Sequence, residues 1–220
     1  MSLQEARSFT HPSPLEQAHK KNIPMLQTGD IVLIRHKKIH LRKALHRVYQ
    51  CYWDHVALII FPKDESNGYE SHILIESIQH GLNSTWKKGV EVHRLEKYLK
   101  HPDRYDIGIK RMKHIDTRIQ ERVRSFMLLN VDTPYYPLST FKLTLASIWE
   151  PYKQSFVERQ RYSCSSLIQK AFYEAVDWKE RPLITFKTES GLSPIEIQEL
   201  TTPKDIARSP VCSWIWNKHP

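Results

Sequence analysis

The stretch that decides the fold is residues 161–176, RYSCSSLIQKAFYEAV. Its apolar residues recur at helical spacing and predict an amphipathic helix: Leu167, Ile168, Ala171, Phe172, Ala175 and Val176. Ser163, Ser165 and Ser166 are candidates for its N-terminal cap. Cys164 is therefore expected in the first turn, where unpaired backbone N–H groups and the positive end of the helix dipole favour a thiolate.

A cysteine in this position has two interpretations. As a thiolate it would be a nucleophile. As a thiol it would be a core residue, because it precedes Leu167 and Ile168 by three and four residues on the apolar face, and free cysteine is among the most buried residue types. From this helix alone, the buried structural thiol is the favoured interpretation.

Upstream of the helix, short β-branched and apolar runs predict a sheet. The expected strands cover residues 31–34, 56–61, 72–76, 89–93 and 105–110, and a terminal strand covers residues 213–216. Helical spacing is found at residues 95–99 and 114–130, whereas residues 182–210 look like a turn-rich tail. Strands and helices in this arrangement indicate an α+β fold.

The second and third expected strands form a predicted hairpin that holds the other candidate site residues. His55 stands at the head of the second strand, and Glu76 ends the third. Antiparallel pairing would place them opposite or nearly opposite each other, within reach of a carboxylate–imidazole hydrogen bond. A slip of one residue in the register would break this contact.

Composition limits the classes of protein to consider. The chain has 220 residues and a formal net charge of +9. It is expected to form one domain over residues 26–220, with residues 1–25 as an N-terminal arm. Six glycines without a G-x-G-x-x-G pattern disfavour a glycine-rich nucleotide loop. Three widely spaced cysteines, Cys51, Cys164 and Cys212, support neither a disulfide framework nor a zinc cluster, and we expect no metal or organic cofactor.

Several motifs follow one another in an order that resembles a known superfamily. They are LQTGDIVL at 26–33, WDHVALI at 53–59, ILIES at 73–77, GVEVHRLEKYL at 89–99, TPYYPL at 133–138, YSCSSLI at 162–168 and TTPKDIARSP at 201–210. Together they are similar to the NlpC-like superfamily, in its YiiX/YaeF-like amidase branch. That resemblance implies a papain-like fold with an antiparallel, partly barrelled sheet packed against helices. The fold would be circularly permuted, because the histidine precedes the cysteine in this chain.

The resemblance also implies roles for individual residues. Cys164 would be the nucleophile of a cysteine hydrolase of the amidase, peptidase or esterase type, acting through a thioester, or an acyltransferase. His55 would be its base and then its acid, and Glu76 would orient the imidazole. The substrate-binding residues would be Tyr162, Trp53 and Tyr135. With this constellation in view, the nucleophile becomes the favoured interpretation of Cys164.

Two positions depart from the superfamily pattern. Ala57 stands where glycine is common, which a strand should tolerate. In the segment VDTPYY at 131–136, the usual glycine and final acid of Gly-x-Pro-Tyr-Asp are missing, which bears on substrate specificity. The substrate is expected to be a small acyl amide, a lipid or a peptide.

A non-catalytic alternative rests on the charge. The basic cluster from Arg35 to Arg47, RHKKIHLRKALHR, could hold an anionic lipid, nucleic acid or partner protein on the same fold, although a helix with a solvated basic face is the favoured interpretation of it. Without an apolar signal segment or a transmembrane run, the expected location is cytoplasmic, with a viral or secreted-effector context left open.

Overall fold

A six-stranded antiparallel sheet forms the centre of the molecule, in the order β4-β3-β2-β1-β5-β6. The computed structural model describes residues 25–37, 51–63, 71–78, 89–134, 162–187 and 191–217. The strands are β1 (Ile31–His36), β2 (His55–Phe61), β3 (Ile73–Ile78), β4 (Gly89–Arg94), β5 (Tyr105–Met112) and β6 (Cys212–Asn217). The sheet is not closed, since β4 and β6 each pair on one side among the described strands. All six predicted strands are confirmed, and no predicted end differs from the observed end by more than two residues.

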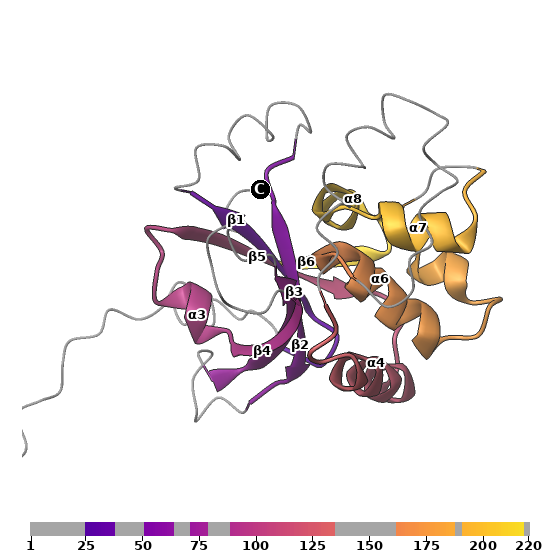
Figure 1. Cartoon of the computed structure of the whole chain (residues 1–220), viewed down its shortest axis with the longest axis horizontal. Helices are drawn as coiled ribbons and strands as arrows, with labels where there is room; N and C mark the ends of the chain where they lie inside the picture. The colour runs from indigo at the N-terminus through magenta and orange to yellow at the C-terminus, as the bar shows by residue number, and fades with distance from the viewer. Residues whose placement is uncertain are drawn as a thin grey trace, which may run out of the picture.

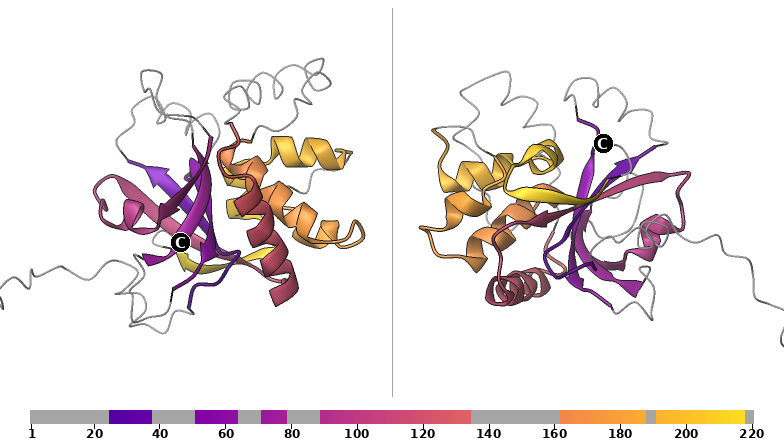
Figure 2. Two further views of the ribbon diagram at one scale, coloured as in Figure 1. Left: turned by 60° about the horizontal axis from the view of Figure 1, so that its bottom comes forward. Right: turned by 180° about the vertical axis from the view of Figure 1, so that it is seen from behind.

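Helices cover the two faces of the sheet unequally (Figures 1 and 2). The short α3 (Glu96–Leu99) lies on one face. On the other lie α4 (Thr117–Leu129), α6 (Cys164–Ala175), α7 (Pro194–Leu200) and α8 (Pro203–Arg208), and the 3-10 helix η4 (Arg181–Ile184) follows α6. This arrangement confirms the predicted α+β class.

Alternate residues of the central strands explain why their sequences are continuously apolar. In β1, Ile31 and Leu33 pack on the side of α4 and α6, whereas Val32 and Ile34 pack on the side of α3. A strand buried on both faces needs apolar side chains at every position rather than at every second one. The run IVLI is therefore the sequence signature of a central strand.

The structure corrects the prediction of a turn-rich tail over residues 182–210, because this segment contains the helices α7 and α8. Ser193 caps α7 reciprocally with Glu196, and Thr202 caps α8 with Asp205, each with proline at the start of the helix. Ser-Pro-x-Glu and Thr-Pro-x-Asp are start signals for short helices. These start signals specify two short helices even though the segment has no long apolar stripe.

Lys110 on β5 ties the second of these helices to the sheet. Its buried ammonium donates to the carbonyl oxygens of Ile206, Ala207 and Ser209, at 2.8–3.0 Å. These carbonyls lie at the C-terminal end of α8, where intrahelical donors run out, although the Ser209 N–H also donates to the Ile206 carbonyl, at 3.4 Å. The buried lysine thus stabilises the C-terminal end of α8 by supplying donors to these three carbonyls.

The arm predicted over residues 1–25 lies almost wholly outside the described residues, so the domain boundary stays a prediction. Most of the basic cluster also lies outside them. Its first two residues, Arg35 and His36, continue β1, which corrects the expectation that the helix would begin at residue 35. None of the helices in the described ranges has the length and apolarity needed to cross a membrane.

Candidate active site

Cys164 is the first residue of α6, as the pattern of its helix predicted. Ser163 is the N-cap and forms a reciprocal capping box with Ser166. This arrangement fixes the first turn, so that Cys164 sits at the positive end of a twelve-residue helix. The thiol is half-buried rather than enclosed in the core.

His55 comes from the first position of β2 and Glu76 from the fourth position of β3. Extending the register of Leu58 with Ile75 places Glu76 beside Ala57, two residues along from His55. The side chains are therefore diagonal neighbours on one face, and His55 Nε2 lies 2.5 Å from Glu76 Oε2. The structure brings the predicted pair into direct contact.

The three groups shift one another's pKa values. Burial opposes ionisation of Cys164, but the charge and hydrogen bond of His55 and the backbone N–H groups of Val56 and Ser165 outweigh it and lower the pKa of the thiol. Burial likewise opposes protonation of His55, yet Cys164 and Glu76 raise its pKa to about 10. Cys164 and His55 thus favour each other's charged forms, a thiolate beside an imidazolium.

The other two cysteines differ in this respect. Burial raises the pKa of Cys51, and it raises that of Cys212 to about 12. A thiol with a raised pKa is protonated and unreactive at neutral pH. Among the three cysteines, only Cys164 has the environment of a nucleophile.

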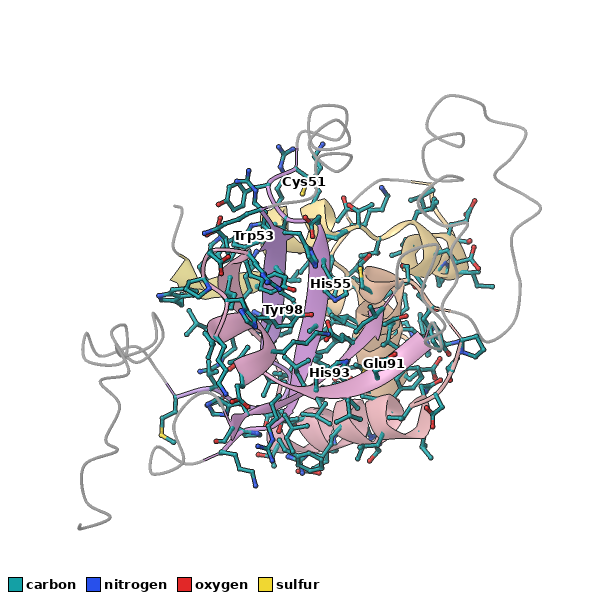
Figure 3. All side chains as sticks on the ribbon, turned by 60° about the vertical axis from the view of Figure 1, so that its left-hand side comes forward. Cys51, Trp53, His55, Glu91, His93 and Tyr98 are labelled. Carbon is teal, nitrogen blue, oxygen red and sulfur yellow. The ribbon has the colours of Figure 1, made fainter. Side chains whose placement is uncertain are left out.

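Glu76 is the most heavily used group of the site, and this was not foreseen from the sequence. Its carboxylate is 1% exposed, and it accepts hydrogen bonds from the Tyr98 hydroxyl at Oε2 and from Lys97 Nζ, at 2.8 Å, at Oε1. His93 Nε2 lies 3.8 Å from Oε1. Figure 3 shows His55, Tyr98 and His93 from the α3 side of the sheet.

These donors act on the charge state of the buried acid. Burial would raise the pKa of Glu76, but the hydrogen bond and charge of His55, followed by those of Lys97, lower it to about 2. Lys97 and Tyr98 lie in the motif GVEVHRLEKYL, which contributed to the family resemblance. No spacing rule, however, connects a residue of α3 with one of β3.

A second histidine–carboxylate pair lies next to the first. His36 Nδ1 is 2.6 Å from Asp54 Oδ1, and the ring centroids of His36 and His55 are 6.2 Å apart. His36 also contacts the ring of Tyr105, which in turn packs edge-on against Tyr98. These aromatic rings pack beside His55 and Glu76 on the α3 side of the sheet.

The predicted substrate-binding residues occupy different surroundings. Tyr162 is buried with its ring against Phe126, and its backbone carbonyl accepts from the Ser77 hydroxyl at 2.7 Å. Trp53 is buried over Gly108, where a Cβ atom would lie 2.9 Å from its ring. Tyr135 lies outside the described residues. A substrate contact stays a prediction for all three.

A half-buried thiol at a helix start, hydrogen-bonded to a histidine that is itself paired with a buried carboxylate, has the arrangement of groups found in papain-like cysteine hydrolases. Residues 25–215 match the family described as permuted papain-like amidase enzymes, YaeF/YiiX, C92. The chain belongs to this family, and its permuted papain-like fold is the one that the sequence predicted.

The solved structures contain a protein of the same fold. The metalloprotein YiiX from Escherichia coli O157:H7 matches with a TM-score of 0.58 and 14% sequence identity, over 90% of this chain and 100% of that one. At this identity the likeness shows the fold alone. No curated protein matches the chain. Within the described ranges of this chain, no group of three or more His, Cys, Asp or Glu side chains is placed to hold a metal ion.

Proposed function

We propose that this amidase-family protein is a cysteine hydrolase in which Cys164 is the nucleophile, His55 the acid and base, and Glu76 the orienting acid. One observation carries the proposal. The imidazole of His55 is hydrogen-bonded on one side to Glu76 and on the other to the sulfur at the start of α6. Because Nε2 faces the carboxylate, Nδ1 is the nitrogen available to the sulfur.

The first half of the reaction makes a thioester. The Cys164 thiolate attacks the carbonyl carbon of an amide or ester, a C–S bond forms, and the carbonyl oxygen becomes an oxyanion. The backbone N–H of Cys164, at the start of the helix, supports that negative charge. When the tetrahedral intermediate collapses, the C–N or C–O bond breaks and the leaving group takes the proton from His55.

The second half returns the enzyme to its starting state. Neutral His55 now removes a proton from water, whose oxygen attacks the thioester carbon. The C–S bond breaks, the carboxylic acid leaves, and the thiolate and imidazolium form again. An acceptor other than water would take the acyl group by the same steps, which would make the protein an acyltransferase.

The substrate class that we propose is a small acyl amide, lipid or peptide. The family supports an amide, and the chemistry of a thioester covers all three. The apolar segment 141–149 could wall an acyl chain, although core packing is the favoured interpretation of its sequence, and it lies outside the described residues, as does Tyr135. Substrate identity therefore rests on assay rather than on a lining of known residues.

The alternative function is a basic binding module for an anionic lipid, nucleic acid or partner protein. It rests on the net charge of +9 and on the cluster from Arg35 to Arg47. In the described part of that cluster, the guanidinium of Arg35 lies 4.1 Å from the centroid of the Tyr52 ring. Binding of this kind would weaken steeply with salt. Cytoplasmic location, like this partner, stays a prediction.

Alkylation by iodoacetamide, mapped by mass spectrometry across the three cysteines, tests the catalytic proposal. We expect Cys164 to react selectively at pH 6, and His55→Ala to abolish that selectivity. Cys51 and Cys212 are internal controls in the same sample. If Cys164 reacts no faster than they do, or only above about pH 8 as an ordinary thiol does, the hydrolase proposal is wrong.

A further inference from the structure

We propose that Lys97 is a positioning residue that sets the proton affinity of His55 by sharing the carboxylate of Glu76 with it. The inference rests on the proposed function, because it deepens the role of the same triad. Its basis is the division of the carboxylate between its two oxygens. Oε2 accepts from His55 and from the Tyr98 hydroxyl, whereas Oε1 accepts from Lys97.

Tyr98 on Oε2 and Lys97 on Oε1 affect the carboxylate in different ways. Tyr98 is buried and, because burial and then the charge of Glu76 raise its pKa well above the ordinary value, it donates a neutral hydrogen bond throughout the working pH range. It therefore fixes the direction of the carboxylate without changing its charge. Lys97 brings a full positive charge to the other oxygen, 2.8 Å away.

That charge competes with the imidazolium for the same carboxylate. A free carboxylate beside His55 would stabilise the imidazolium strongly and make it a poor proton donor to the leaving group. Lys97 partly neutralises the carboxylate and so weakens its hold on the proton of His55. The ammonium is a third exposed, which reduces its effect through solvent screening but does not remove it.

The other charged groups near Glu76 come from three elements. His93 on β4 lies 3.8 Å from Oε1 but is itself paired with Glu91, 2.9 Å away, so its interaction is divided. His55 lies on β2, and Cys164 on α6 is hydrogen-bonded to His55. Among the residues that the structure describes, Lys97 on α3 is thus the cation closest to Glu76 after His55 itself.

Three variants, two at Lys97 on α3 and one at Lys100 just beyond it, separate this electrostatic role from a structural one. Lys97→Met removes the charge and keeps most of the apolar stem, while Lys97→Arg restores a cation. Lys100→Met is the matched control, because Lys100 lies on the surface beside the end of the same helix and pairs with Glu96 rather than with Glu76. Thermal unfolding of each variant shows whether the fold is retained.

The readout is the titration of His55 in the full chain, followed by NMR of the imidazole C–H signals and assigned by their loss in His55→Gln. We expect Lys97→Met to move this titration up by about half to one pH unit. We expect Lys97→Arg to return it to the wild-type position, and Lys100→Met to leave it unchanged.

Two results would overturn the inference. No movement in Lys97→Met would mean that the ammonium is screened out. A downward movement would mean that the variant had detached Glu76 from His55, as a purely structural role of Lys97 predicts. Neither result depends on whether Cys164 reacts, so failure of the hydrolase proposal, which shows as an unreactive Cys164 in the wild type, is read separately.

Discussion

Replacing Glu76 by glutamine tests the triad most directly. The substitution keeps the size of a side chain that is 1% exposed, but it removes the charge that faces His55 across 2.5 Å. An opposite charge at such a distance changes a pKa by about 1–3 units. We therefore expect the pKa of His55 to fall by that amount from about 10, towards the value of an ordinary histidine.

The rate of Cys164 alkylation as a function of pH reports this change. In the wild type the rate should rise once when the thiol ionises beside the imidazolium, and again when His55 loses its proton, because an unpaired thiolate is more basic and more nucleophilic. In Glu76→Gln the second rise should move down by about 1–3 pH units. The ion pair, and with it amide hydrolysis, would then occupy a narrower range of pH.

Glu91→Gln is the matched control, since Glu91 is a second carboxylate, on β4, that pairs with His93 of the same strand at 2.9 Å. It should leave both rises in place. The reasoning is refuted if Glu76→Gln folds normally, as shown by its thermal unfolding, and its second rise stays where it is in the wild type. The carboxylate would then be a packing group rather than the orienter of the imidazole.

Three further predictions concern stability. Ser163→Ala should lower the free energy of unfolding by about 0.5–2 kcal/mol and slow the alkylation of Cys164. Ser193→Ala, which removes the equivalent cap of α7, should lower the free energy of unfolding without slowing that alkylation. Equal alkylation rates in the two variants would contradict the link between the cap and the thiolate. Lys110→Met should lower the free energy of unfolding, measured by urea titration, by at least about 2 kcal/mol, because hydrogen bonds to charged groups contribute roughly 1.5–3 kcal/mol each. An unchanged free energy would mean that the bonds from Lys110 to the end of α8 do not stabilise the fold. The pKa of Glu76 is depressed from 4.5 to about 2, so its contribution to stability is complete above about pH 4.5 and disappears as the pH falls through 2, a loss on the order of 3 kcal/mol. The free energy of unfolding, followed as the pH is lowered, should therefore fall less steeply in Glu76→Gln than in the wild type. Identical slopes would argue against a buried, ionised Glu76.

Much of the fold was predictable because its strands are continuous apolar runs and its main helices have clear periodicity. The positions of Cys164, His55 and Glu76 followed from local signals: a helix start, a strand start and a hairpin. The bulge between Ile59 and Phe61 shifts the register within that hairpin, and a bulge leaves little trace in a sequence. The sequence predicted the two residues as opposite or nearly opposite, and the structure places Glu76 beside Ala57, diagonal to His55.

The partners of Glu76 on α3 could not be predicted in the same way. Lys97 and Tyr98 stand next to each other in a four-residue helix, in a stretch that looks like ordinary charged surface. They reach the acid because α3 folds back onto the face of the sheet opposite α6. That contact depends on tertiary packing, which neither periodicity nor motif spacing encodes.

The strand order has a consequence for how the protein is made. Strands β1 to β5 lie next to one another in the sheet and all fall within residues 31–112, while α6 begins only at residue 164. On the ribosome, the histidine and its acid can therefore meet before the cysteine has been synthesised. The sulfur would gain its reactivity only when α6 docks onto the five strands that precede it, so a nascent chain carries no activated thiol while those strands are still folding.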